Sequence, residues 1–268
     1  MLGFIGLGNM NGAILKGVLA AGIVEPGDVY FTRAHAQAGR DVAGELGINF
    51  VESNAELAKK LGDGDVIISG VKPQYMLEVL RELGTDASGK VIVSVAAGVA
   101  IERLESALPE GTSVVRAMPN VPAQVGAGMT ALAANAHTTE DELHAVEVLF
   151  GAVGETVAIA EPYFATFSAI AGCSPAWTLT YIDALSRAAL AAGMPKDVAL
   201  KVASQAVLGS AKYALEMMDE ERPAQLLDRV TSPGGTTIAG LVAMEKAGFS
   251  SAVVRGVESA IARDAQLG

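Results

Sequence analysis

The sequence predicts an α/β protein in which a doubly wound parallel sheet is followed by an all-α C-terminal domain. Strand-like and helix-like patterns alternate up to residue 160, and only helix-like patterns follow. Alternating strands and helices are typical of parallel sheets with crossover helices. We therefore expect two domains, residues 1–160 and residues 161–268.

The expected elements alternate regularly through the first half. The expected strands are residues 2–5, 29–32, 49–51, 66–69, 91–95, 113–116, 129–133 and 156–159. The helices between them are residues 10–21, 36–46, 55–61, 73–83, 101–107 and 139–150. The second half is expected to consist of helices at residues 161–192, 195–218, 223–230, 236–246 and 250–265. Ligands of such sheets bind beyond the carboxyl ends of the strands, so the loops after strands are the places to search for a site.

Composition limits the partners of the chain. It has 268 residues, a net charge of −11 and 51% hydrophobic residues. A negative charge of this size is unsuited to nucleic acid, and no apolar run approaches the roughly 18 residues of a membrane span. Cys173 is the single cysteine, which excludes an internal disulfide and fits a reducing, cytoplasmic setting. We expect no metal site and a small-molecule partner.

The N-terminal residues form a dinucleotide-binding fingerprint. An apolar run leads into Gly6 and Gly8, and a helical pattern begins at Met10. Gly6 permits a tight turn, Gly8 lets the backbone approach a pyrophosphate, and the helix N-terminus supplies free N–H groups. Asn11 stands at the position of the third glycine of the motif. We expect a Rossmann-type domain that binds its cofactor through Gly6, Leu7, Gly8, Asn9 and Met10.

The end of the second expected strand indicates which cofactor is used. Enzymes of this fold that prefer NAD carry an Asp or Glu there, bonded to the ribose 2′-hydroxyl. Here the strand ends in Thr32 and Arg33, while Asp28 lies at its other end. A hydroxyl followed by a guanidinium suits a 2′-phosphate. We therefore expect NADPH, with NADH as a weaker cofactor.

Three further loops follow expected strands at the same edge of the sheet. Lys72 and Pro73 come after strand 66–69 and are expected to form a second wall of the cofactor groove. The small residues of 94–99 would let the nicotinamide ribose approach the backbone, and Arg116 begins a loop that contains two prolines. Each loop taken singly is explained as an ordinary connection without a ligand. Their joint position at one edge of the sheet is therefore the observation that indicates a binding site.

In the second half, residues 232–237 form an expected anion seat. Ser232 and the glycines after it turn the chain, and Thr236 and Thr237 open a helix. Free N–H groups and two hydroxyls therefore converge, as a carboxylate requires. A helix start capped by serine or threonine is the simpler alternative. The expected substrate contacts are Ser232, Gly234, Gly235, Thr236 and Thr237.

These stretches together resemble the pyrroline-5-carboxylate reductase family. The matching residues are 4–10, 71–74, 94–99, 116–123, 205–212 and 230–241. The resemblance implies NAD(P)H-dependent reduction of L-1-pyrroline-5-carboxylate to L-proline, the last step of proline biosynthesis. It implies Thr237 as the catalytic residue, with its hydroxyl near the ring nitrogen. Besides Gly6 to Met10, the implied cofactor contacts are Thr32, Arg33, Asn54, Val71, Lys72, Pro73, Ala96, Ala97 and Gly98.

Two departures from the family pattern leave alternatives open. Asn11 replaces a small residue of the fingerprint, and residues 171–177 read Ala-Gly-Cys-Ser-Pro-Ala-Trp where the family reads Ser-Gly-Ser-Gly-Pro-Ala-Tyr. One alternative is a hydroxyacid dehydrogenase of the 3-hydroxyisobutyrate type, because residues 6–10 also resemble the opening of that group. The second half, however, lacks the lysine in a glycine-rich helix that those enzymes use. The other is a non-catalytic NADP-binding sensor.

The helical half is expected to bind a second copy of the chain. Between residues 164 and 192 the charged residues are Asp183 and Arg187, and apolar residues surround the expected helix. A helix that is apolar on all sides must be buried on all sides. The resemblance implies a homodimer through this domain, with loop 232–237 of one subunit completing the neighbouring cofactor site. It leaves open a decamer of dimers.

Overall fold

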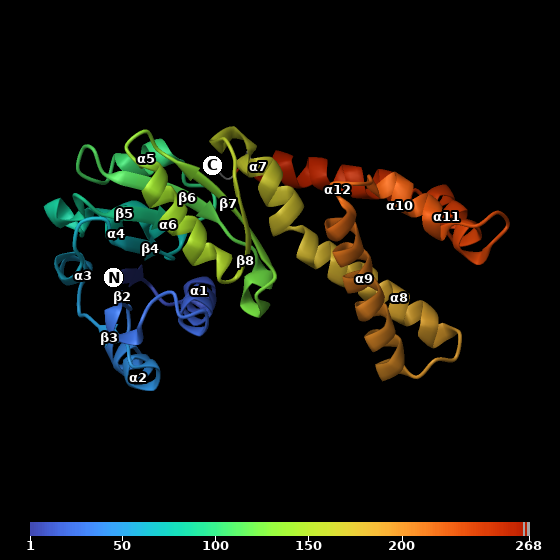
Figure 1. Cartoon of the computed structure of the whole chain (residues 1–268), viewed down its shortest axis with the longest axis horizontal. Helices are drawn as coiled ribbons and strands as arrows, with labels where there is room; N and C mark the ends of the chain where they lie inside the picture. The colour runs from blue at the N-terminus through green and yellow to red at the C-terminus, as the bar shows by residue number, and fades with distance from the viewer. Residues whose placement is uncertain (265, 267–268) are drawn as a thin grey trace. The chain divides into compact units, whose positions relative to one another are not determined.

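The computed structural model describes residues 1–264 and 266, and it divides into two compact units. One unit contains Met1–Gly172 and the described residues from Ile261 onward, and the other contains Cys173–Ala260. The strands are β1 (Leu2–Ile5), β2 (Val29–Thr32), β3 (Asn49–Phe50), β4 (Val66–Ser69), β5 (Val91–Ser94), β6 (Ser113–Met118), β7 (Gly128–Ala134) and β8 (Gly154–Ala158) (Figure 1). The first helices are α1 (Asn9–Ala20), α2 (Ala36–Leu46), α3 (Asn54–Lys60), α4 (Pro73–Arg81), α5 (Ile101–Glu105), α6 (Glu140–Gly151) and α7 (Phe164–Phe167). The later helices are α8 (Ser174–Ala191), α9 (Lys196–Met217), α10 (Pro223–Val230), α11 (Thr236–Lys246) and α12 (Phe249–Asp264).

The sheet confirms the doubly wound topology. Its strand order is β3-β2-β1-β4-β5-β6-β7-β8, so the chain reverses its direction of travel across the sheet after β3. All neighbouring strands are parallel except β6 and β7, which pair antiparallel. The expectation of a wholly parallel sheet is corrected at this pair. The connection there is a short 3-10 turn, η3 (Val121–Val125), whereas a parallel pair needs a crossover of about a dozen residues or more.

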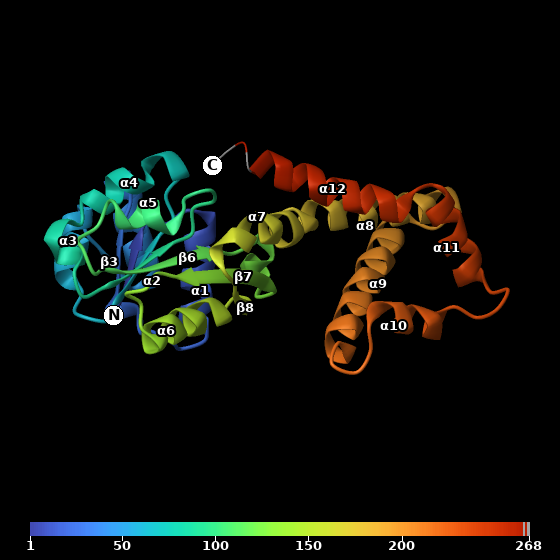
Figure 2. The same ribbon diagram turned by 90° about the horizontal axis from the view of Figure 1, so that it is seen from above.

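Helices cover both faces of the sheet and form two apolar layers. Figure 2 shows α3, α4 and α5 on one side and α1, α2 and α6 on the other. Phe4 of β1 packs into the layer under α1, and Ile5, the next residue, packs into the opposite layer. Side chains alternate along a strand, so a strand buried on both faces must be apolar throughout. Burial on both faces of the sheet explains why the residues before Gly6 form a continuous apolar run.

The expected helix at residues 161–192 is interrupted. A 3-10 turn at Glu161–Tyr163 precedes α7, and Ser168–Gly172 forms a π-helical segment before α8. Pro175 has no N–H group for the carbonyl of Ala171, four residues earlier. That carbonyl accepts a hydrogen bond from Asn120 Nδ2 at 2.9 Å instead. Residue 265, at the end of the last expected helix, lies outside the described residues.

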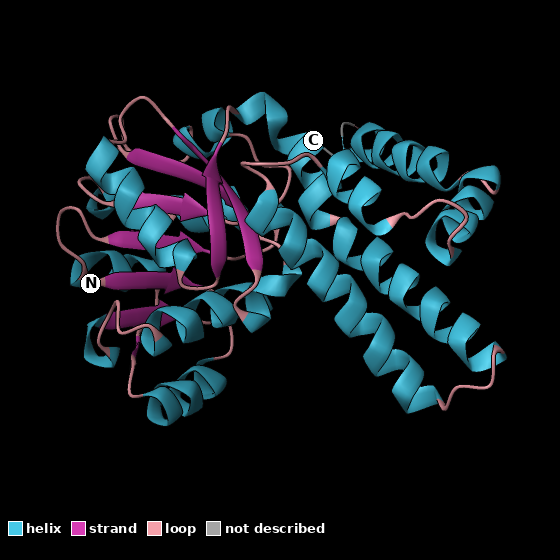
Figure 3. Ribbon diagram, turned by 45° about the vertical axis from the view of Figure 1, so that its right-hand side comes forward, coloured by secondary structure: helices cyan, strands magenta, loops and turns pink. Residues whose placement is uncertain are grey.

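The unit Cys173–Ala260 consists of helices and loops, and all strands lie in the first unit (Figure 3). Its helices leave large apolar side chains exposed, among them Leu208 at 61%, Leu215 at 66% and Val254 at 56%. In the described residues, α11 and α12 contain no buried side chain. No single described helix is long and apolar enough to cross a bilayer, although the α11–α12 pair, bent by 50°, meets the length and composition criteria together.

Candidate cofactor and substrate sites

The expected cofactor residues lie at one edge of the sheet. Ile5 pairs with Thr32 and Ser69, and Ser69 pairs with Ser94, so these strands end at the same level. The loops after β1, β2, β4 and β5 therefore leave the sheet side by side. These loops and the adjoining strand and helix ends carry Gly6–Met10, Thr32, Arg33, Val71, Lys72, Pro73, Ala96, Ala97 and Gly98.

The glycine turn has the geometry that phosphate binding requires. Gly6 has a φ of 77°, where side chains are strained, and its N–H donates to the carbonyl of Thr32 at 3.1 Å. Gly8 precedes α1, and a Cβ there would meet no described atom within 4 Å. The protein itself therefore does not require glycine at this position. The open space lies beside first-turn N–H groups that have no acceptor within the helix, which suits a closely approaching anion.

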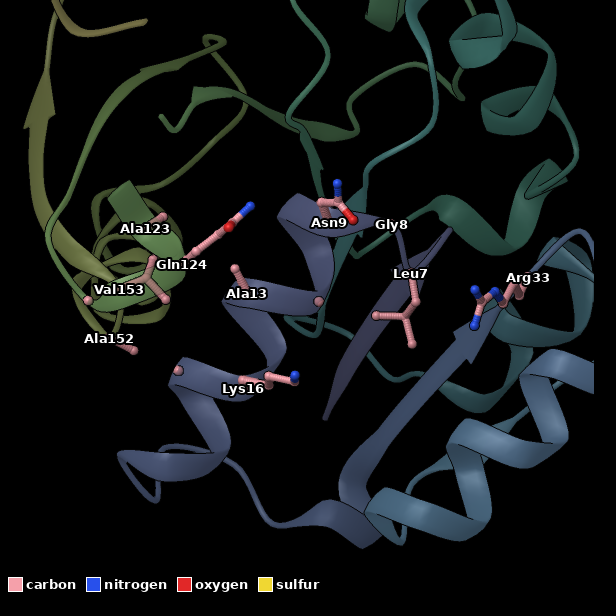
Figure 4. Close-up of a pocket in the computed structure, with 13 residues that line it drawn as sticks. Leu7, Gly8, Asn9, Ala13, Lys16, Arg33, Ala123, Gln124, Ala152 and Val153 are labelled. Atoms are coloured by element: carbon pink, nitrogen blue, oxygen red, sulfur yellow. The ribbon is translucent and has the colours of Figure 1, made fainter. Parts of the chain in front are cut away.

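A groove of about 730 Å³ runs along α1 from this turn. Leu7, Gly8 and Asn9 line its start, and Lys16 and Arg33 contribute positive charge to it. Figure 4 shows Lys16 and Arg33 on opposite sides of Leu7, with Gln124 beside Ala13 on the side of α1 away from Arg33. Sequence reasoning did not single out Lys16. Its i, i+7 spacing from Asn9, which places both on one helix face, was the available signal.

Thr32 and Asn54 are buried and bonded to each other. The Thr32 hydroxyl donates to Asn54 Oδ1 at 2.6 Å, and Asn54 Nδ2 donates to Glu82 Oε2 at 2.6 Å. The hydroxyl proton of Thr32 is thus used within the protein. Arg33 is exposed, with one bond of 3.4 Å from its Nη1 to the carbonyl of Ala38. The guanidinium is therefore the group of this pair that is available to a phosphate.

The residues expected to form a second wall lie directly after β4 and β5, outside the lining of the groove along α1, and Pro73, Ala97 and Gly98 line a separate hollow of about 450 Å³. Val71 lies against the turn, since a Cβ on Gly6 would be 3.4 Å from Val71 Cγ1. Lys72 precedes the first residue of α4, Pro73, and both are exposed. After β5, Ala96 is buried, while Ala97 and Gly98 are exposed. The φ of 74° at Gly98 explains the glycine at that turn.

Arg116, by contrast, is engaged inside the first unit. Its Nη1 forms an ion pair of 2.9 Å with Glu161 Oε1, and its guanidinium lies 4.4 Å from the centre of the Phe164 ring. The same Glu161 oxygen accepts from the N–H of Ile101 at 2.8 Å. This cluster fastens the chain that follows β8 to β6 and to the start of α5.

In the second unit, the 232–237 loop requires glycine at two positions, each for a different structural reason. Gly234 has a φ of 69°, and a Cβ on Gly235 would overlap the side chain of Ser232. The N–H of Gly235 donates to the carbonyl of Ser232 at 3.0 Å, which closes the turn. Gly235 precedes α11, whose first residues Thr236 and Thr237 are exposed. Within the described chain no side chain caps α11, so the capped-start alternative does not describe this loop.

The residues that depart from the family pattern begin α8. Cys173 is a half-buried free cysteine. Trp177 lines a hollow of about 330 Å³ with Phe249, Ala252, Val253 and Gly256. The indole of Trp177, which is larger than the tyrosine ring of the family pattern, therefore lies within the helical unit beside α12, where a Cβ on Gly256 would be 3.9 Å from it.

The first unit has the sheet, glycine turn and open helix N-terminus of a dinucleotide-dependent oxidoreductase, and the comparisons with known proteins agree. Residues 1–98 match the family model described as NADP oxidoreductase, coenzyme F420-dependent, and residues 161–267 match the model for pyrroline-5-carboxylate reductase dimerisation. The chain is 39% identical over 267 residues to pyrroline-5-carboxylate reductase of Escherichia coli strain K12, covering 99% of this chain and 97% of that one. It belongs to the pyrroline-5-carboxylate reductase family.

Other relatives and solved structures agree along the whole chain. The reductase of Synechocystis is 38% identical, with 100% of this chain and 98% of that one covered. The structure of a pyrroline-5-carboxylate reductase from Coxiella burnetii superposes with a TM-score of 0.92 at 31% identity, covering 100% of this chain and 98% of that chain. The Plasmodium falciparum enzyme with NADP bound has a TM-score of 0.84 at 29% identity, covering 98% and 96%.

Proposed function

We propose that this protein reduces L-1-pyrroline-5-carboxylate to L-proline with NADPH, the last step of proline biosynthesis. One observation carries the proposal: the similarity to relatives named for this reaction spans both the unit with the glycine turn and the unit with the 232–237 loop. The P. falciparum relative with NADP bound supports the choice of cofactor.

The cofactor would be held by the first unit. The N–H groups at the start of α1 bind the pyrophosphate, where Gly8 leaves space for it. Arg33 binds the 2′-phosphate, with Lys16 adding positive charge to the same groove. Residues 71–73 and 96–98, which follow β4 and β5 at the same edge of the sheet, would contact the remainder of the cofactor. The reduced nicotinamide supplies the hydride when it is bound.

The substrate would be held by the second unit. The backbone N–H groups of Gly235, Thr236 and Thr237 bind its carboxylate, and the Thr237 hydroxyl lies near the ring nitrogen. A protonated cyclic imine is already electrophilic, so orientation and exclusion of water matter more than a strong base. The exposed hydroxyl of Thr237 suits this positioning role.

The proposed assembly is a homodimer through the helical unit, with a decamer of dimers as a larger form, in a cytoplasmic setting. The match to a dimerisation family model and the exposed apolar side chains of α9 and α12 support the dimer. Covering such a surface with a second copy removes it from water.

The decisive experiment follows the absorbance of NADPH after addition of pyrroline-5-carboxylate, with proline measured as the product. Loss of absorbance together with formation of proline is expected. Binding of NADPH without turnover of the imine would point to an NADP-binding sensor. Oxidation of a hydroxyacid without reduction of the imine would point to the dehydrogenase alternative.

A further inference from the structure

Asn11, at the third glycine position of the fingerprint, joins two strand ends. It is 1% exposed, and its Nδ2 donates to the carbonyl of Gly6 at 2.7 Å. The same nitrogen lies 3.3 Å from the carbonyl oxygen of Ile68 and 3.4 Å from that of Ile5. One side-chain amide on α1 therefore holds the carboxyl ends of β1 and β4 together.

Gly70, the first residue after β4, provides the space that Asn11 occupies. A Cβ on Gly70 would lie 2.5 Å from both Cγ and Nδ2 of Asn11, closer than packed atoms approach. The left-handed glycines of the chain do not include Gly70, so space rather than backbone conformation excludes a side chain. The larger residue on the helix and the missing side chain after β4 thus form an interlocking pair.

This pair lies between the glycine turn after β1 and the loop after β4. Gly6 and Gly8 form the turn on one side of it, and Val71 directly follows Gly70 on the other side. The N–H of Gly70 also donates to the carbonyl of Ile5 at 3.0 Å. A shift of Asn11 or Gly70 would therefore move the phosphate-binding turn relative to residues 71–73.

The pair and its neighbour Ser69 also include buried polar atoms without hydrogen-bond partners, which lower the stability of the fold and which packing alone does not explain. Within residues 1–264 and 266, the buried side-chain atoms without a hydrogen-bond partner are Asn11 Oδ1 and Ser69 Oγ. They belong to the pair and to the residue next to it. Buried polar atoms without partners are rare and occur preferentially where function constrains the site.

We propose that Asn11 is a positioning residue for the cofactor, and that Gly70 is its matching residue. Asn11 stands at the third glycine position of the fingerprint, and together the two residues set the separation between the phosphate-binding turn and residues 71–73. This inference rests on the proposed function, in which the groove at Gly6–Met10 holds NADPH.

The test is a fluorescence titration with NADPH in the absence of substrate. Gly70→Ala and Asn11→Asp should each raise the Kd for NADPH by about tenfold or more. The first forces a Cβ into the amide, and the second faces a carboxylate toward three carbonyl oxygens. In the double variant Asn11→Gly/Gly70→Ala, the Asn11 amide that the Cβ of the new alanine would meet is removed. Its Kd for NADPH should therefore be at least about threefold lower than that of Gly70→Ala alone, which means that the effects of the two substitutions are not additive.

In steady-state assays of the single variants, KM for NADPH should rise, while kcat at saturating NADPH changes little.

The matched control is Gly44→Ala in α2, where a Cβ meets no described atom within 4 Å and no change in Kd is expected. Unfolding midpoints show which variants are folded, and Asn11→Ala replaces Asn11→Asp if the latter does not fold. Wild-type binding with unchanged Kd values in folded Gly70→Ala and Asn11 variants would overturn this inference alone. Absence of NADPH binding by the wild type would overturn the proposed function with it.

Discussion

The charge at the end of β2 should decide cofactor preference. Arg33 is exposed and faces the groove, whereas the proton of Thr32 is used by Asn54. Arg33→Ala should weaken NADPH binding by about 1.5–3 kcal/mol, the range for hydrogen bonds to charged groups, and leave NADH binding nearly unchanged. Titrations with both cofactors measure this. Equal losses for both would contradict the assignment.

Arg40→Ala is the control for this substitution. Arg40 lies in α2 and pairs with Glu52 at 2.7 Å, outside the residues that line the groove. Its replacement removes the same charge from the same region of the molecule. We expect no selective loss of NADPH binding, which separates a specific contact of Arg33 from general electrostatics.

Thr237 should act through its hydroxyl. Thr237→Val keeps the shape of the side chain and removes one hydrogen-bonding group, so kcat/KM for pyrroline-5-carboxylate should fall by roughly tenfold or more. Thr180→Val in α8 is the control, since the Thr180 hydroxyl donates to the carbonyl of Ala176 within its own helix. Unchanged kinetics for Thr237→Val would show that this hydroxyl has no role in the reaction.

Sequence reasoning predicted the local turns of the backbone, while the roles of the site residues stay predictions. The Gly6 turn and the Ser232–Thr237 loop depend on backbone conformation at consecutive positions, which glycine and threonine reveal directly. The bond from Thr32 to Asn54 and the contact of Asn11 with Gly70 were not predicted. Each joins residues far apart in the chain, so neither spacing nor composition indicates it.

Among the helices and strands, three strands and three helices were predicted to the residue. β1, β2, β4, α2, α10 and α11 have the bounds expected from the sequence. The antiparallel direction of β7 was missed because it depends on a short connection, and the π-helical segment was missed because Ala171 bonds to Asn120 instead of to its own helix. The domain boundary expected at residue 161 stays a prediction, and the compact units divide between Gly172 and Cys173.

Close packing of α1 depends on Gly17. A Cβ there would overlap Val153 and lie 3.0 Å from the carbonyl oxygen of Ala152, at the turn after α6. Gly17→Ala should therefore lower the free energy of unfolding by about 1–3 kcal/mol, the usual cost of overpacking. Urea unfolding at a fixed protein concentration measures it. Gly44→Ala should instead raise that free energy by up to about 1 kcal/mol, because it is an open helix position. Equal effects of the two substitutions would exclude the packing explanation.

For the molecule as a whole, the helical unit requires a partner surface. Its buried apolar side chains are few, with Ala199, Ala203 and Leu226 among them, while long apolar side chains along α8, α9 and α12 are exposed. Exposed apolar surface on this scale marks an interface. Obligate dimer interfaces bury on the order of 2,000 Å² or more and resemble a divided core. Light scattering at micromolar concentration should therefore show no monomer, and a stable, fully active monomer would exclude the proposed dimer.

A mixing experiment tests whether the two subunits share a site. Gly8→Asp places a carboxylate where the pyrophosphate is expected, and Thr237→Val removes the hydroxyl from the substrate loop. If loop 232–237 of one subunit serves the cofactor groove of its neighbour, a mixed dimer contains one intact site and one doubly altered site. Co-refolding equal amounts should then restore on the order of a quarter of wild-type activity, because about half of the dimers are mixed. If each chain instead serves its own groove, the mixture will show only the mean activity of the two variants refolded separately.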